Sequence, residues 1–332
     1  MKKYLFMAMA AVTITSCSQD EVMEVAEKQA ITFGNAFVEN ATRAIDLTYA
    51  SNNLPESFLV YGTTKGNETN APVVTIFNGV TVAENITTNV ASGYGYGAES
   101  TQYWIDGNDY NFAAVVGGTI SNDKTITYNA DYTKTSDVDL LYDNDKFGVY
   151  QKGTSEQVVD FNFHHLLSRV HFSVKNEIAS NVEGNAYTYK VTDVKITNAL
   201  PTGRYDITKY DTDDVAWTAT GTGTNVSFGN VTSATKDTDD EAAIYIEGGK
   251  TETSHYSRLL IPNNYEALNV QCTITTYFNN QQVDVENYDK NIAINLEEGK
   301  AYNFVIALEL NQPIKFTATT MTDWDEQDDT KL

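Results

Sequence analysis

The chain has 332 residues, and its 45 Asp and Glu against 22 Lys and Arg give a formal net charge of −23 at pH 7. So acidic a chain repels phosphate backbones, which argues against a nucleic-acid partner, while 41% hydrophobic residues with 21 Tyr and 14 Phe argue against wholesale disorder. Its two cysteines exclude a disulfide framework and a Cys-rich zinc site, and no apolar run reaches the roughly 18 residues of a membrane-spanning helix.

The first 17 residues are typical of an export signal. Lys2 and Lys3 precede a short apolar stretch, and Ile14-Thr15-Ser16-Cys17 closes it with small residues before a cysteine. This segment resembles a lipoprotein signal peptide that is cut before Cys17, with acyl chains such as palmitate then attached to that cysteine. The other interpretation is an ordinary signal peptide with a chance cysteine. The lipoprotein interpretation predicts attachment to the outer membrane on the cell surface.

Residues 18–43 form the next segment. It begins with an acidic stretch at residues 18–21 that is similar to the tether of surface-exported lipoproteins and equally typical of a solvated linker. Ile31-Thr32-Phe33 then opens a strand-like run. Arg43-Ala44 follows and is an Arg-x bond in a polar segment.

The rest of the chain predicts an all-β protein. Short runs rich in Val, Ile, Tyr, Phe and Thr alternate with Gly, Asn, Asp and Pro, which favours a β-sandwich or a pair of them. We expect two domains, at residues 44–157 and 158–332, joined by a polar linker at residues 143–157. Loops are expected at residues 182–186, 218–227 and 233–241. Strands are expected at residues 58–61, 73–77, 110–116, 170–174, 189–196, 258–261, 270–278, 302–310 and 314–322.

The last of these strands has two distinct faces. Ile314, Phe316, Ala318 and Thr320 alternate onto one face, and the residues between them lie on the other. The tail and the N-terminal strand both carry Ile-x-Phe, so one apolar slot could accept either. The pattern is also common enough in strands for both segments to carry it by chance.

Residues suited to chemistry are present but favour structural roles. His164, His165 and His171 lie close in sequence and a metal site is conceivable, yet His165 and His171 lie in a strand-like segment that favours packed or surface histidines over ligands. The acidic runs at residues 137–139, 143–145 and 237–241 could bind calcium, but none has EF-hand spacing, which favours solvated loops. Cys272 lies in an alternating strand pattern and is expected to be a buried thiol.

Aromatic residues could instead form a sugar-stacking platform, at Trp104, Trp217 and the run Tyr94-Gly95-Tyr96-Gly97. Such residues are more often part of a core. With no Gly-x-Ser-x-Gly elbow and no Cys/His pair at catalytic spacing, we expect no enzyme, no cofactor and no metal.

Five stretches, in chain order, carry a family resemblance. They are Tyr103-Trp104 with Tyr110-Asn111-Phe112-Ala113-Ala114, then Phe163-His164-His165-Leu166-Leu167-Ser168-Arg169-Val170, Leu260-Ile261-Pro262-Asn263, Glu298-Gly299-Lys300-Ala301-Tyr302-Asn303-Phe304 and Ala318-Thr319-Thr320-Met321-Thr322-Asp323-Trp324. Together with the signal peptide, this ordered set resembles the fimbrillin family of type V pilin lipoproteins of the Bacteroidales. One departure is Asn263, where the family pattern has Gln.

The resemblance implies two tandem β-sandwiches with transthyretin-like topology, and export as a lipoprotein to a surface fimbria that supports adhesion. It implies that an Arg-specific protease cuts at Arg43 and Ala44 and releases the N-terminal strand. It also implies that a neighbouring subunit then donates its C-terminal strand, here through Ile314, Phe316, Ala318 and Thr320. The partners would be other pilin subunits.

Two alternatives remain open at this level. The chain could be the anchor or tip subunit of the same fimbria, and an anchor would keep its lipid and its N-terminal strand. It could also be a surface glycan-binding lipoprotein, which would share the signal peptide and the sandwiches but not the ordered blocks. For the tail itself, the competing interpretation is that it is the last strand of its own domain.

Overall fold

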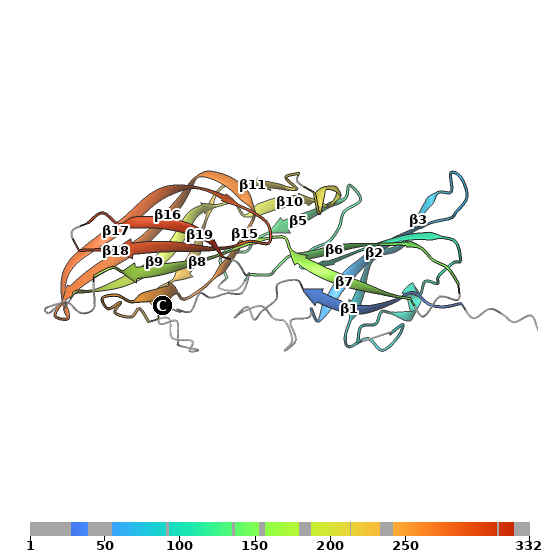
Figure 1. The fold of residues 1–332 in the computed structure, drawn as a ribbon, viewed down its shortest axis with the longest axis horizontal. Helices are drawn as coiled ribbons and strands as arrows, with labels where there is room; N and C mark the ends of the chain where they lie inside the picture. Colours follow the sequence, from blue (N-terminus) through green and yellow to red (C-terminus); the bar gives the residue numbers. More distant parts are fainter. Residues whose placement is uncertain are drawn as a thin grey trace, which may run out of the picture.

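The computed structural model describes residues 28–38, 55–90, 93–134, 137–152, 157–178, 187–212, 214–232, 242–310 and 312–321. Within these ranges the regular elements are β-strands and two short 3-10 helices, η1 (Ala98–Ser100) and η2 (Ile207–Lys209), so the predicted all-β class is confirmed. The described part of the chain has no helix long and apolar enough to cross a membrane. The molecule is elongated, and the N-terminal and C-terminal halves occupy opposite ends of its long axis (Figure 1).

The N-terminal half is built on one six-stranded sheet. Its strand order is β1 (Thr32–Val38), β7 (Val158–His165), β6 (Leu141–Val149), β4 (Asp109–Val116), β2 (Ser57–Lys65) and β3 (Val73–Ala83). β6 and β7 pair at only two positions, Leu141 with His165 and Tyr142 with His164. The sheet therefore turns a corner there, and aromatic side chains of β1 and β7 pack against those of β2, β3 and β4 in a shared core.

The C-terminal half is two sheets that pack over one core. The first has the order β12 (Thr224–Gly229), β9 (Tyr187–Ala199), β16 (Asn263–Phe278) and β17 (Gln281–Leu296). The second has the order β13 (Val231–Thr232), β14 (Thr251–Ser254), β8 (Ser168–Asn176), β18 (Ala301–Leu308) and β19 (Lys315–Met321), and β15 (Arg258–Leu260) also pairs with β8. Alternate side chains of β8 and β18 meet those of β9 and β16 in the core, as period-2 burial requires.

A third sheet links the halves. It consists of β11 (Trp217–Thr220), β10 (Thr202–Asp206) and β5 (Thr125–Asn129) in that order, so β5 from the N-terminal half of the sequence pairs with β10 from the C-terminal half. Its side chains form a separate core, which we call the middle core, with the outer face of β4 and β6 and with residues around β15. The middle core contains Val115, Ile126, Tyr128, Leu140, Tyr142, Leu166, Leu167, Tyr205, Ala216, Trp217, Leu259 and Ile261.

Two sequence-based expectations about loops are wrong. Residues 143–149 of the expected linker belong to β6, an interior strand of the first sheet. Asp143 is tolerated there because its carboxylate accepts the backbone N–H groups of Asn144 and Asn162, each at 2.7 Å. Most of the loop expected at residues 218–227 belongs to β11 and β12.

The strand pairing also differs from the expected grouping at residue 157. β7 lies after that position but pairs with β1 and β6, and β5 lies before it but pairs with β10. The hydrogen-bonded sheets therefore do not follow a division at residue 157. The loops expected at residues 182–186 and 233–241 lie outside the described residues.

Candidate functional site

β1 occupies a deep position at the edge of the first sheet. It pairs in parallel with β7, from Thr32 opposite Val158 to Val38 opposite Phe163. On its other side, the backbone N–H of Ile31 donates to the backbone carbonyl of Gln102 at 2.8 Å. Phe33 also forms an isolated β-bridge with Val90. β1 thus lies in a slot between β7 on one side and residues 90 and 102–104 on the other, which we call the β1 slot.

Two side chains of β1 and that of Ile31, the residue just before it, point into the core. Ile31, Phe33 and Ala36 have no exposed surface, whereas Phe37 is 54% exposed. The Phe33 ring contacts four aromatic rings, with centroids 5.4 Å away at Phe77, 5.6 Å at Tyr96, 6.0 Å at Phe112 and 6.1 Å at Phe161. Full burial of one such side chain stabilises by roughly 1.5–3 kcal/mol, so Phe33 is a principal anchor of the strand.

The backbone of β1 approaches β7 closely at Gly34. A Cβ at this position would collide with the side chains of Asp160 and Val158. The pairing register also shifts between Phe33 and Ala36, where β1 carries an extra residue. Any larger residue at position 34 would therefore force the side chains of Asp160 and Val158 to shift.

β19 is an edge strand too, but it packs far less deeply. It pairs antiparallel with β18, from Lys315 opposite Ala307 to Met321 opposite Ala301. Of residues 314–320, only Ile314 and Phe316 are partly buried, and the others are exposed. The Phe316 ring lies 5.6 Å from the ring of Phe304.

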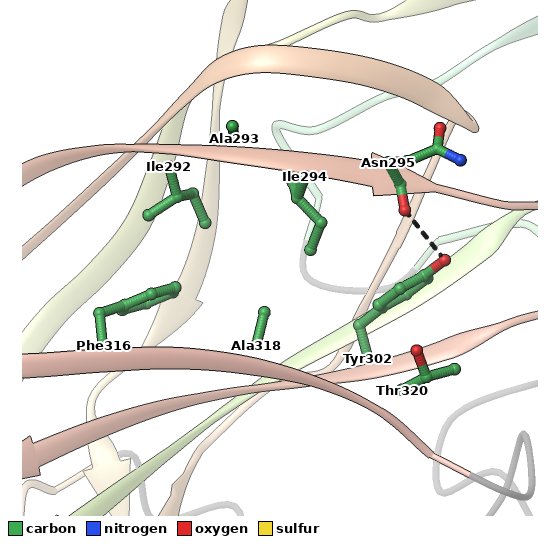
Figure 2. Close-up of a pocket in the computed structure, with 8 residues that line it drawn as sticks. All are labelled: Ile292, Ala293, Ile294, Asn295, Tyr302, Phe316, Ala318 and Thr320. Atoms are coloured by element: carbon green, nitrogen blue, oxygen red, sulfur yellow. Dashed lines mark hydrogen bonds between the residues drawn. The ribbon is translucent and has the colours of Figure 1, made fainter.

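An open groove of about 520 Å³ separates β19 from β17, the edge strand of the facing sheet. In Figure 2, Phe316, Ala318 and Thr320 of β19 face the groove from one side, and Ile292 and Ile294 of β17 face it from the other. At one end the Tyr302 hydroxyl donates to the carbonyl of Asn295 at 3.2 Å. The apolar face of β19 is therefore only partly covered by its own domain, and we call this space the β19 groove.

The predicted site residues fall into two groups. Ile314, Phe316, Ala318 and Thr320 lie on or next to β19, and the last three line one groove. Cys17, Arg43 and Ala44 lie outside the described residues. The slot around Phe33 was only partly predictable, because its walls come from strands far apart in the sequence.

His165, His171 and Cys272 are buried within the fold. His165 Nδ1 lies 2.5 Å from a carboxylate oxygen of Asp139, and both side chains are buried. Burial, with a smaller effect from the nearby Arg169 guanidinium, lowers the pKa of His171 to about 4. Burial raises the pKa of Cys272 to about 12, so this thiol is unreactive, in agreement with the sequence expectation.

The other candidate chemistry does not form a site in the described residues. No group of three or more His, Cys, Asp or Glu side chains there could hold a metal ion. The run at residues 237–241 lies outside the described ranges. The proposed aromatic platform is core instead, since Tyr94, Tyr96, Trp104 and Trp217 are all at most 7% exposed.

Comparison with known proteins agrees with this architecture. The model of a family described as fimbrillin-like matches residues 42–324. The crystal structure of a fimbrial protein from Bacteroides vulgatus ATCC 8482 superposes with a TM-score of 0.60 at 14% identity, covering 90% of this chain and 100% of that one. A candidate cell adhesion protein from Bacteroides ovatus ATCC 8483 gives a TM-score of 0.51 at 16% identity, covering 91% and 99%. At these identities the likeness shows a shared fold. A search of curated proteins finds no match.

Proposed function

The chain belongs to the fimbrillin-like family, and from this premise we propose that it is a structural subunit of a cell-surface fimbria that supports adhesion. The family consists of structural adhesion proteins, so the chain is not an enzyme. Its partners are other pilin subunits, and its two halves are tandem sandwiches of transthyretin-like topology. The subunits join by strand exchange, in which the tail of one subunit replaces β1 of the next.

The observation that carries this proposal is the difference in depth between two edge strands. β1 and the preceding Ile31 together bury three side chains completely, and Phe33 contacts four rings. In the tail at residues 314–320, only the side chains of Ile314 and Phe316 are buried, and each only in part. A tail that leaves its own shallow site and enters an emptied β1 slot therefore gains apolar burial, so exchange is favourable once β1 has gone.

The two strands also present the same side chains in the same order. The N-terminal segment buries Ile31, just before β1, with Phe33 and Ala36 of β1, and the tail offers Ile314, Phe316 and Ala318. The spacing differs by one residue, because β1 has its extra residue between Phe33 and Ala36. Phe316 would enter the aromatic pocket that Phe33 fills, with Thr320 further along the same face.

Maturation would make the slot available. Cys17 carries the lipid that holds the precursor on the outer membrane, and an Arg-specific protease cuts between Arg43 and Ala44. That cut separates residues 18–43, which include β1, from the rest of the subunit. The released subunit would then remain on the cell through its polymer.

The decisive experiment compares wild type with Arg43→Ala on cells, by mass spectrometry of the N-terminal residue and by gels of unboiled samples. Wild-type subunits should begin at Ala44 and form a ladder of oligomers. Arg43→Ala subunits should begin at Cys17 and run as monomers. Arg204→Lys is the matched control, because it removes an arginine from β10 and should leave the ladder intact.

Two results would contradict the proposal. An unchanged ladder in Arg43→Ala would show that assembly does not need this cut. Wild-type protein that begins at Cys17 would instead identify an anchor subunit, which keeps both its lipid and β1.

A further inference from the structure

A second cleft, of about 860 Å³, lies beside the middle core and far from β19 in the fold. Its floor is the outer face of β2, β3, β4 and β6. Its opposite wall comes from the turn before β5, with Ile120 and Lys124, and from η2 with the adjoining residues up to Thr212. The cleft is thus built by two different sheets and their connections.

The strand register arranges the floor in two rows. One row crosses four strands through Asn78, Tyr61, Ala113 and Asn144, which pair in that order. The next row crosses three strands through Thr75, Thr63 and Asn111. Because neighbouring strands lie about 4.8 Å apart, amide, hydroxyl and aromatic groups repeat at short regular intervals across the floor.

The amides of the cleft have unused hydrogen-bonding capacity. Among the described residues, the side chains of Asn78, Asn111, Asn122 and Asn144 make no hydrogen bond to the protein. Asn198, outside the cleft, differs: its side-chain oxygen accepts from the backbone N–H of Asn269, and its amide donates to the carbonyl of Ala267. Each cleft amide offers two N–H donors and an acceptor oxygen.

The charge of the cleft contrasts with that of the chain. Although the net charge is −23, the residues that line the cleft include one acid, Asp211, and one base, Lys124. Tyr61 and Tyr210 add half-buried rings. Tyr61 is fixed because its hydroxyl accepts from the backbone N–H of Ile120 at 3.0 Å, and Tyr210 packs edge-on against Tyr142 at 4.8 Å.

We propose that this cleft binds a neutral oligosaccharide. Sugar hydroxyls both donate and accept hydrogen bonds, which matches amide groups that do the same, and the apolar faces of sugar rings pack against tyrosine. A neutral cleft in an acidic protein selects against acidic ligands. This inference goes beyond assembly by strand exchange, because the cleft uses none of Ile31, Phe33, Ile314 or Phe316.

The test uses the full-length purified chain on an array of neutral and acidic oligosaccharides, followed by titration calorimetry with the best neutral hit. Asn111→Asp and Asn78→Asp place a negative charge among the ligand hydroxyls while keeping the size of each exposed side chain. Each should weaken binding by about tenfold or more. Asn291→Asp, the same change on exposed β17, is the control and should bind as wild type does.

Thermal melts of all variants should agree, because the three side chains are exposed. Binding to no neutral oligosaccharide, binding only to acidic ones, or equal affinity in wild type and both cleft variants would overturn the inference. Its failure is separate from that of the proposed function, since the cleft variants should still form the oligomer ladder on cells.

Discussion

Arg258 is a cation held inside the protein, with 1% of its side chain exposed. Its Nε and Nη2 atoms donate to the two carboxylate oxygens of Asp137 at 2.9 and 2.8 Å, and Nη1 donates to the carbonyl of Ser227 at 2.8 Å. The backbone N–H of Leu259 also donates to Asp137, at 2.7 Å. This group ties the segment before β6 to β15, which belongs to the other half of the chain.

Asp137→Ala should therefore destabilise the protein by about 3–5 kcal/mol, because it leaves a buried guanidinium without its partner. Urea denaturation of wild type and variant measures the loss. Asp123→Ala is the matched control, since it breaks the exposed pair with Arg204 and should change stability little. If both substitutions lower the free energy of unfolding equally, the buried pair stabilises the protein no more than the exposed pair does.

His171 makes stability depend on pH. Its pKa is about 4 in the folded protein, lowered mainly by burial, against an ordinary value of 6.5. As pH falls below 6.5, the unfolded chain takes up a proton that the folded chain refuses until about pH 4, so folding stability declines across that interval. The total loss is on the order of 3 kcal/mol. His171→Gln should flatten this part of the curve in denaturation at pH 7, 6, 5 and 4, and an unchanged slope would contradict the assignment.

Removing β19 is expected to cost the fold less than removing β1, because β19 packs less deeply. Within residues 314–320, where burial is described, a deletion of residues 314–332 takes away two partly buried side chains, Ile314 and Phe316, and it leaves β18 buried on its inner face. We expect a sharp thermal melt and a monomer in size-exclusion chromatography. Phe33→Ala is the comparison, because truncating a fully buried aromatic residue costs about 3–5 kcal/mol.

If the deleted protein loses its cooperative melt, β19 is an indispensable strand of its own domain. Oligomers that persist in a well-folded deletion would likewise exclude donation of this strand.

The sequence predicts strands well where side chains alternate between core and solvent. The runs at residues 110–116, 170–174 and 270–278 all lie in strands, because each presents an apolar face to a core. The sequence-based prediction was wrong at β6, where polar residues such as Asp143 and Asn144 suggested a linker. The backbone N–H groups that satisfy Asp143 come partly from β7, and periodicity along one strand cannot reveal a partner on another.

The same limit applies to the functional sites. Ile-x-Phe in β1 and in the tail could be read from the sequence, but the depth at which each packs could not. Depth depends on Phe77, Phe112 and Phe161, which reach Phe33 only after three other strands have been placed. The rows of the cleft were invisible for the same reason, since they run across the strands rather than along them.

At the scale of the whole molecule, the middle core joins the two halves into one continuous body. Trp217 packs in this core, and its indole N–H donates to the carbonyl of Leu166 at 2.8 Å. β5 and β10 pair over five residues each across the sequence halves. The polar segment expected to link the halves, at residues 143–157, has no described residue in this core, and its residues 143–149 belong to β6 instead.

The direction of β1 has a mechanical consequence. β1 runs along the long axis of the molecule, beside β7 (Figure 1). A strand held in that position and pulled along the axis is loaded in shear, so its backbone hydrogen bonds to β7 carry the force together instead of opening one by one from an end. A filament built through this slot would resist stretching far better than peeling, and the weakest direction for the joint would be sideways, away from the sheet.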